Sequence, residues 1–469
     1  MKCPFGIHHG AVSYAMTTLG AGMMNHIFVF YYVKLFLNRY KISEASFHQA
    51  QVLYMIWNAI NDPLFGYIQD NSKLRWCSIR RLSILYGAPL YAVAFLLPWF
   101  PWKQYEDGDW LSGAHLIVAL CAYDTMLTFV LLAQCALFAE ISNKHENRLQ
   151  LIKYNQVASL VGSCSVLFCG LFSKNMENFS YFQGFNVLIA VLAFVCMSYT
   201  GIHSVSQFEH TESTTGTAAE GTDDALTWSS VFSLTKQIVM QRNFVLFVAM
   251  NFCQVFHLAF MNNFMMIFVE HLLPTEAFPS FVKSIMYGAG FICPQILVLC
   301  SHSLLGKLGY YRVILYTFYI EMAAGSVMFL LGPSHYYLLA LFLPANLVLV
   351  QAAFSLFNLP LADIIDSDLQ MYKRRSPLSS MVFGTNALFT KPAQSLAPML
   401  VVTILNQYGY EKLKDKTAEG DLSSLLVLHD AMFWLVCLAP VCIASLQILA
   451  WTPFSIRDSH TIHTKYIEN

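Results

Sequence analysis

The sequence predicts an all-α integral membrane protein with twelve spanning helices arranged as two six-helix bundles. The first observation is composition, because 56% of the 469 residues are hydrophobic and only 12% are charged, whereas soluble domains carry about 25% charged residues. The second is a mean hydropathy of +0.50. The third is the recurrence of long apolar segments along the whole chain. A chain of this kind folds with the lipid bilayer as its solvent.

Twelve segments reach the length of about 20 residues that a helix needs to cross ~30 Å of hydrocarbon. They are 12–37, 45–69, 82–100, 114–139, 151–173, 182–203, 243–271, 278–304, 311–332, 335–362, 379–406 and 428–451. Several contain polar residues in the middle of the span, as helices do that face a protein interior. The N-terminal sequence MKCPFGIHHG lacks the charged region and the cleavage site of a signal peptide. We therefore expect the first span itself to direct insertion.

Both termini are expected in the cytosol, and the plasma membrane is the expected compartment. In this orientation the inner loops hold nearly twice as many of the 27 Lys and Arg residues as the outer loops. Positive charge accumulates on the cytoplasmic side of membrane proteins. The glycosylation acceptor Asn178-Phe179-Ser180 then falls in a short outer loop close to lipid, where we expect it to stay unmodified.

The longest polar interruption covers 204–242 and separates six spans from six. Its first part, HTESTTGTAAEGTDD, has the composition of a flexible linker. In Trp228–Met240 apolar residues recur at helical intervals, which predicts an interfacial helix. The expected organisation is a bundle over 1–203, this linker, a bundle over 243–451 and a cytosolic tail over 452–469.

The two halves share a glycine-containing basic turn after the second span of each. The first turn reads GYIQDNSKLRWCSIRR, and the second, Gly306–Arg312, reads GKLGYYR. Weak internal symmetry of this kind is typical of transporters built from parallel repeats.

The residue pattern argues against nucleic acids, organic cofactors and catalysis. The net charge is −1, so no general positive field favours nucleic acid as a partner. No hydrolase, metalloprotease, P-loop or dinucleotide signature occurs, so we expect no enzyme activity and no cofactor beyond a coupling H⁺ or Na⁺. The cysteines form no CxxC motif and lie mostly in apolar segments, as small buried hydrophobes. We expect a monomer in the bilayer that binds a small-molecule solute.

One polar stretch stands out inside the second span, Trp57–Asp70, which reads WNAINDPLFGYIQD. Asn58, Asn61 and Asp62 follow the spacing i, i+3, i+4, so a helix places them on one face. A carboxylate in hydrocarbon costs several kcal/mol unless it faces a protein interior, and it is a functional-site hypothesis by default.

This stretch and a second one resemble a known transporter family. WNAINDPLFGYIQD is similar to the signature "D-x-x-N-D-P-x-x-G" of the glycoside–pentoside–hexuronide cation symporters, a branch of the major facilitator superfamily. The segment LADIIDSDLQMYKRRSPLSSMVFGTNALFTKPAQSLAP resembles the loop and eleventh span of that family. Over its whole length the sequence also resembles the vertebrate family called major facilitator superfamily domain-containing protein 13, or transmembrane protein 180. The resemblance implies the twelve-helix transporter fold and solute transport coupled to a cation.

The resemblance places cation or proton coupling at Asp62, Asn58 and Asn61, with Lys391 on the lysine of the eleventh span. The symporters have an aspartate where this chain has Asn58. One carboxylate fewer favours a proton over Na⁺ at this site, or no coupling at all. Lys391 lies deep in its span, where an ammonium needs a carboxylate partner, and a structural ion pair is the alternative to a coupling role.

The family's sugar-binding acids are not conserved as such in this chain. The first-span position falls near Thr17 or Thr18, and the fourth span has Asp124 about one turn before the family position. Sugar specificity is therefore not carried over, although a carbohydrate remains among the candidate solutes.

A second group of polar residues within spans predicts a substrate cavity. Its members are Asp124, Gln134, Gln254, His257 and Asn262. Hydrogen bonds between helices are the structural alternative for such residues. Met261 stands one turn beyond His257, so no metal-binding face forms there. Glu321 is interpreted as a protonated or locally hydrogen-bonded acid.

Charged residues at the cytoplasmic ends of spans predict an inner gate closed by acid–base pairs. They are Asp70, Arg75, Arg80, Arg81, Asp363, Asp366, Arg374 and Arg375. The alternative for the basic members is that they set the membrane topology.

The function predicted from these features is symport of a small organic solute with a cation, a proton rather than sodium, by alternating access. The alternative is a membrane protein that kept the transporter fold and lost ion coupling. Such a protein would work as a uniporter, or as a binding or surface protein without transport.

Overall fold

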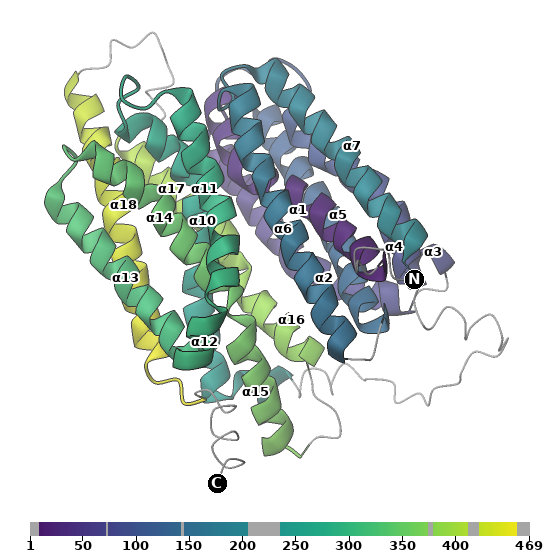
Figure 1. Cartoon of the computed structure of the whole chain (residues 1–469). Helices are drawn as coiled ribbons and strands as arrows, with labels where there is room; N and C mark the ends of the chain where they lie inside the picture. Colours follow the sequence, from purple (N-terminus) through teal and green to yellow (C-terminus); the bar gives the residue numbers. More distant parts are fainter. Residues whose placement is uncertain are drawn as a thin grey trace. The chain divides into compact units, whose positions relative to one another are not determined.

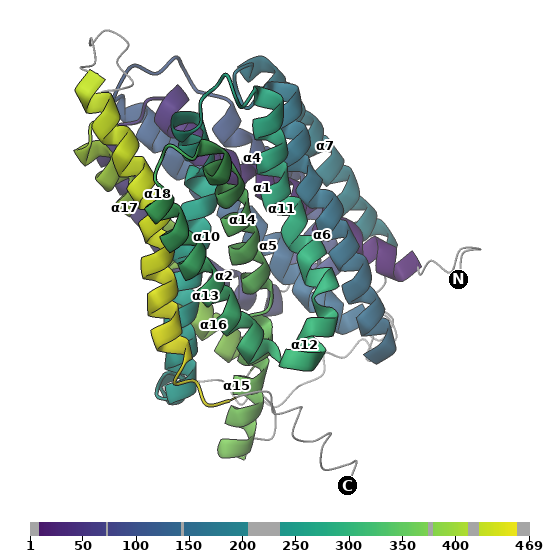
Figure 2. The same cartoon turned by 60° about the vertical axis from the view of Figure 1, so that its left-hand side comes forward.

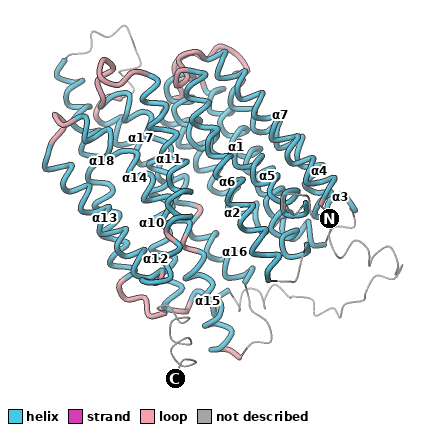
Figure 3. Tube along the Cα trace, viewed as in Figure 1, coloured by secondary structure: helices cyan, strands magenta, loops and turns pink. Residues whose placement is uncertain are grey.

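The computed structural model describes residues 9–71, 74–141, 145–204, 235–373, 379–410 and 422–456. Every regular element in these residues is a helix (Figures 1 and 3). The helices group into two compact units by their contacts. The first unit consists of residues 1–223 and 279–295, and the second of residues 224–278 and 296–469.

The first unit contains the helices of the N-terminal half and the start of α11. They are α1 (His9–Lys34), which continues into the π-helical turn η1 (Leu35–Arg39), α2 (Glu44–Asn71), α3 (Arg75–Ser78), α4 (Arg80–Leu96), the 3₁₀ turn η2 (Leu97–Trp99), α5 (Trp110–Ile141), α6 (His145–Ser173) and α7 (Phe179–His203). α1 packs against α6 and α7, α4 against α5 and α7, and α2 against α5.

The second unit contains the helices of the C-terminal half (Figure 2). They are α10 (Arg242–Leu272), the end of α11 (Ser280–Cys300) from residue 296 on, α12 (His302–Leu308), α13 (Tyr310–Leu331), α14 (Tyr336–Ser355), α15 (Asn358–Met371), α16 (Ser379–Thr390), α17 (Pro392–Gln407) and α18 (Leu422–Trp451). α10 packs against α14, α17 and α18, and α13 packs against α14 and α18. Glycines with positive φ, Gly309 and Gly332, begin and end α13.

Close helix contacts in both units depend on glycine. A Cβ atom at Gly20 of α1 would lie 2.9 Å from the Ala193 carbonyl oxygen of α7. A Cβ atom at Gly325 of α13 would lie 2.8 Å from the Cys437 carbonyl oxygen of α18. Small residues at such places let the backbones of membrane helices approach, so each unit is closely packed at these points.

Ten helical segments in the described residues are long and apolar enough to cross a membrane. α1 and α2, with 26 and 28 residues, are not among these ten, although they coincide with the first two predicted spans and exceed the required length. Two spans combine consecutive helices, Tyr336–Ile365 and Val382–Gln407. The protein is an all-α multi-pass membrane protein, as predicted.

The predicted linker lies mostly outside the described residues, since 205–234 are not among them. Of the predicted interfacial helix Trp228–Met240, residues 235–239 are helical and lead into α10. The predicted domain boundaries remain a prediction. The contacts place residues 279–295 of α11 with the first unit.

Candidate functional site

The clearest polar cluster of the first unit lies between α2 and α5. The Asn61 amide donates from Nδ2 to Asp124 Oδ2 at 2.8 Å and to the Asp124 carbonyl oxygen at 3.1 Å. The same nitrogen donates to Thr128 Oγ1 at 3.1 Å. Asn61 and Asp124 are both buried. A residue predicted for coupling and one predicted for the substrate cavity therefore lie in one hydrogen-bonded cluster.

The register of α2 against α5 positions this cluster. One turn before Asn61, Trp57 Nε1 donates to Thr125 Oγ1 at 2.9 Å. Two turns after it, Gln69 Nε2 donates to the Phe129 carbonyl oxygen at 2.7 Å. Because these three α2 side chains recur at multiples of four residues, they lie on one helix face. That face is held against α5 at three levels.

Of the other predicted coupling residues, the structure describes Asn58 and Lys391 but not the side chain of Asp62. Asn58 is buried on α2, one turn before Asp62. The Asp62 side chain lies outside the part of the chain that the structure describes, so its role stays a prediction. Lys391 is half-buried at the junction of α16 and α17, directly before Pro392. It belongs to the second unit, and its pairing with an acid of the first half also stays a prediction.

A second cluster in the first unit joins α5 to α1 and α6. Gln134 Nε2 donates to Thr18 Oγ1 at 2.6 Å, and that hydroxyl donates to Asn155 Oδ1. Gln134 is buried. From the sequence, Thr18 is only a hydroxyl in place of an acid, and Asn155 is not among the predicted site residues. No local pattern links these three residues, because they meet only through helix packing.

In the second unit, α10 presents the predicted cavity residues to α14 and α18. Gln254 Nε2 donates to the Val350 carbonyl oxygen at 2.7 Å, and Gln254 Oε1 accepts from Gln447 Nε2. Gln351 Nε2 donates to Asn262 Oδ1 at 3.1 Å. Gln254 and Asn262 therefore also bind the helices of this unit together, as amides within membranes commonly do.

His257 meets an acid that the sequence analysis did not pair with it. His257 Nδ1 lies 3.6 Å from Glu321 Oε2 of α13, and both side chains are 0% exposed. On the other side of the ring, Asn346 Nδ2 of α14 lies 3.4 Å from His257 Nε2. No group of three or more His, Cys, Asp or Glu side chains among the described residues could hold a metal. The pair consists of one acid and one base, both buried, and either group can bind a proton.

The signal that could have found this pair is simple. Glu321 and His257 are an acid and a base within apolar spans of the same half. An intramembrane acid is expected to have a partner. The sequence does not give the register of α10 against α13, so the partner could not be named.

Two predicted gate residues of the first unit bond to backbone at helix ends. Arg80 Nη1 donates to the Gln69 carbonyl oxygen at 3.2 Å, and Arg81 Nη1 donates to the Gly201 carbonyl oxygen at 3.4 Å. These bonds tie the start of α4 to α2 and α7. The remaining charged positions have side chains outside the described residues: Asp70, Arg75, Asp366, Arg374 and Arg375.

Asp363 is the predicted gate acid that the structure describes in the second unit. It is buried, and Tyr310 donates to its Oδ2 at 2.5 Å. Asp368, further along α15, accepts from Gln241 Nε2 at 2.5 Å. These bonds join α15 to α13 and to the residue that precedes α10. The gate itself remains a prediction.

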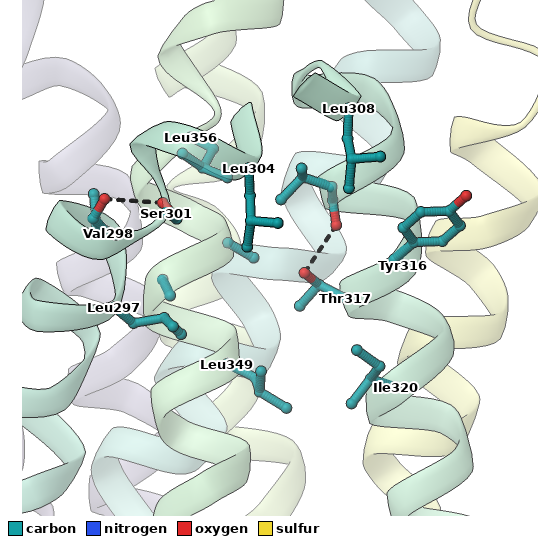
Figure 4. Close-up of a pocket in the computed structure, with 13 residues that line it drawn as sticks. Leu297, Val298, Ser301, Leu304, Leu308, Tyr316, Thr317, Ile320, Leu349 and Leu356 are labelled. Carbon is teal, nitrogen blue, oxygen red and sulfur yellow. Dashed lines mark hydrogen bonds between the residues drawn. The ribbon is translucent and has the colours of Figure 1, made fainter. Parts of the chain in front are cut away.

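A cavity of about 250 Å³ in the second unit is separate from the predicted substrate residues (Figure 4). It is lined by apolar side chains such as Leu297 and Leu349. The hydroxyls of Ser301 and Thr317, which also line it, donate to the Val298 and Val313 carbonyl oxygens of their own helices. Because apolar side chains form most of the lining, this cavity suits an apolar molecule better than a polar solute.

Comparison with known proteins gives consistent results. Residues 13–455 match the model of the family described as MFS/sugar transport protein. Transmembrane protein 180 of Gallus gallus is 32% identical over 482 residues, which cover 95% of this chain and 92% of the relative. An uncharacterized symporter of Synechocystis sp. is 26% identical over 157 residues, 32% of this chain and 28% of the relative.

Among solved structures, the nucleoside transporter NupG has a TM-score of 0.62. The match covers 96% of this chain and 100% of that one, at 11% sequence identity. At this identity the likeness shows the shared fold.

Proposed function

This chain belongs to the MFS/sugar transport protein family, and from that premise we propose that it is a proton-coupled secondary transporter of a small organic solute. Transport proceeds by alternating access. The observation that carries the proposal is the buried Asp124 carboxyl with Asn61 as its hydrogen-bond donor. An acid inside a membrane-spanning helix is expensive and marks an ion or proton pathway by default.

The arrangement around Asp124 supports a proton over a sodium ion. A hard cation needs several oxygen ligands around it. Asn61 presents its amide nitrogen, a donor, to Asp124 and to Thr128. A proton needs only the carboxyl group, and one proton changes the charge of the site by one unit. Asp62, on the same helix as Asn61, is the second acid of the proposed coupling site.

The proposed solute is polar, with sugars and nucleosides as the first classes to test. The family description names sugar transport, and the solved neighbour of similar fold is a nucleoside transporter. Buried amides such as Gln134, Gln254 and Asn262 can exchange hydrogen bonds with hydroxyl groups of a solute. We propose no enzymatic activity.

The test uses purified full-length protein in proteoliposomes that contain a pH-sensitive dye. Uptake of radiolabelled monosaccharides, disaccharides and nucleosides is measured under an imposed pH gradient, and separately under a Na⁺ gradient. We expect the pH gradient alone to accelerate uptake of at least one solute. Asp124→Asn and Asp62→Asn should each abolish the acceleration and keep solute exchange at equal pH.

The matched control is Asp107→Asn, which removes an exposed acid in the loop before α5 and should leave coupling unchanged. Unchanged coupled uptake in both Asp124→Asn and Asp62→Asn would overturn the assignment. An uptake rate that depends on neither the pH gradient nor the Na⁺ gradient would establish the alternative, a uniporter without ion coupling. The amide at Asn58 favours that alternative. The absence of uptake and of any ligand-dependent thermal shift would favour a binding or surface protein.

We also propose that the protein is a monomer at the plasma membrane, with both termini in the cytosol. Its proposed domains are 1–203 and 243–451. The linker 204–242 joins them, and the tail 452–469 follows. Surface biotinylation tests the compartment, and antibody access to terminal tags in intact and permeabilised cells tests the orientation. Staining of either tag in intact cells would contradict the orientation.

A further inference from the structure

The contact between His257 and Glu321 in the second unit has no part in the function proposed above. The two side chains come from α10 and α13, and neither is exposed. His257 Nδ1 and Glu321 Oε2 are 3.6 Å apart. This distance exceeds the 2.7–3.2 Å of an ordinary N–H···O hydrogen bond, so the groups are in contact without being bonded.

The polar atoms of this pair are otherwise unsatisfied. Among the described residues, no hydrogen bond reaches either carboxyl oxygen of Glu321 or the Nδ1 atom of His257. A buried carboxylate without donors carries a desolvation cost of several kcal/mol, which a neutral acid largely avoids. In this conformation Glu321 is therefore expected to hold a proton and His257 to be neutral.

The neighbouring polar side chain that contacts the pair is the neutral Asn346 of α14. On α18, the buried Cys437 is the titratable residue whose backbone lies against Gly325, one turn beyond Glu321 on α13. Ser395 is buried on α17. The charged side chain at the α16–α17 junction is Lys391. The pair thus lies in a medium where a net charge is costly and where a shared proton keeps it neutral.

The orientation of the Asn346 amide selects the tautomer of the neutral ring. If Nδ2 donates to His257 Nε2 as placed, the ring proton is on Nδ1, and Nδ1 cannot accept a second one. If the amide is rotated by 180°, Oδ1 accepts from Nε2–H and Nδ1 is the bare nitrogen. In that tautomer the proton of Glu321 can pass from Oε2 to Nδ1 when the gap closes. The products are a carboxylate and an imidazolium, and the net charge of the pair does not change.

We propose that His257 and Glu321 form a proton-binding site inside the second unit, separate from the acid cluster of the first unit. The ligand is a single proton that the carboxyl and the imidazole share. Opening of the unit to water would allow the proton to leave, because hydration removes the cost of the ionised carboxylate. This inference does not depend on transport of any solute, since the site binds a proton in the resting protein.

The test is pH-difference infrared spectroscopy of the purified full-length protein in lipid nanodiscs, without solute. A protonated carboxylic acid has a carbonyl-stretch band that a carboxylate lacks. We expect such a band at neutral pH in the wild type and its loss in Glu321→Gln. Glu177→Gln, which changes an exposed acid, is the control and should keep the band. His257→Gln should keep it as well but shift its frequency and the pH at which it disappears.

A measurement on the wild type removes any dependence on the folding of the variants. Uniform ¹³C labelling of glutamate must shift this band, which distinguishes it from bands of Asp62 and Asp124. The absence of any band that shifts with the label, or a shifting band that is retained in folded Glu321→Gln, would overturn the protonated glutamate. A band in His257→Gln with unchanged frequency and pH dependence would overturn the shared site. Because these measurements use no solute, they can be interpreted even if the transport assay detects no uptake.

Discussion

Asp124 in the first unit and Glu321 in the second are both buried acids of membrane-spanning helices, but their carboxyl groups have opposite surroundings. In the first unit Asp124 receives the Asn61 amide at 2.8 Å. In the second unit neither carboxyl oxygen of Glu321 has a hydrogen-bond donor within the described residues, and the nearest base is His257 at 3.6 Å. A hydrogen-bond donor therefore offsets the free-energy cost of burying the Asp124 carboxyl, and a bound proton lowers that cost at Glu321.

The difference teaches that the chemical type of a buried residue does not define its role. Where a donor binds the carboxyl, removal of that donor should lower the free energy of unfolding. Where the carboxyl is already neutral, removal of its neighbour should change the free energy of unfolding little. The following predictions test this contrast, from the largest expected effect to the smallest.

The largest effect is expected for Asn61→Leu. The substitution removes the donor to Asp124 Oδ2 and to Thr128 Oγ1 and places an apolar side chain against a buried acid. We expect a loss of about 3 kcal/mol in the free energy of unfolding. Unfolding in mild detergent by heat and by denaturant measures it.

The counterpart in the second unit is Glu321→Met, which removes an acid that has no donor to lose. It should change the same free energy by less than about 1 kcal/mol. Equal losses in the two variants would break the contrast between the units.

Helix packing should respond alike in both units, with a moderate effect. Gly20→Ala places a methyl group against the Ala193 carbonyl oxygen of α7, and Gly325→Ala places one against the Cys437 carbonyl oxygen of α18. Overpacking of this kind costs about 2 kcal/mol. Thermal unfolding midpoints should fall in both variants.

The matched controls for packing are Gly22→Ala and Gly384→Ala. A Cβ atom at Gly22 meets only the His26 side chain at 4.0 Å, and one at Gly384 meets nothing within 4 Å. Both variants should equal or exceed the wild type, because alanine favours a helix. A fall as large as that of Gly20→Ala would contradict the steric explanation.

Neutral amides should contribute less, in proportion to the bonds that their side chains make. Gln69→Leu removes one bond, to the Phe129 carbonyl oxygen, and Gln254→Leu removes two, to the Val350 carbonyl oxygen and from Gln447 Nε2. Hydrogen bonds between membrane helices are worth about 0.6 to 1 kcal/mol each. Denaturant unfolding should therefore give a loss for Gln254→Leu about twice that for Gln69→Leu. A several-fold difference would show that the units differ in more than their acids.

The smallest effect is expected at an acid outside the membrane. Asp109, before α5, lies 2.6 Å from Lys103. The hydrogen bond from Lys103, together with the Leu111 N–H, lowers the pKa of Asp109 below its ordinary value. Its contribution to stability is therefore present above the unfolded pKa and is lost as the pH falls through the folded pKa.

Lys103→Met should reduce only slightly the stability that the protein loses as the pH falls, since exposed ion pairs contribute little and are screened by salt. Thermal midpoints between pH 3 and pH 7, at low and high salt, measure it. A loss at neutral pH comparable to that of Asn61→Leu would contradict the order of effects proposed here.

The sequence predicts the helices and many of the buried polar residues, because hydropathy and the i, i+4 spacing are local properties. Asn61 and Asp124 were both recognised as candidates, but their bond depends on the register of α2 against α5. The same limit applies to His257 and Glu321, which stand on helices far apart in the chain. The contact of Gly20 with α7 likewise has no local signal, since Gly20 and Gly22 are equivalent in sequence and differ only in what faces them.

The packing of α1 has a consequence for how the protein is made. α1 leaves the ribosome before α6 and α7, yet it packs against both. Thr18 of α1 donates to Asn155 of α6, and the Ser13 carbonyl oxygen of α1 accepts from Thr200 of α7. During synthesis α1 therefore lacks these interhelical contacts until α6 and α7 are inserted. Chains truncated before α6 should be recognised by membrane quality control and degraded.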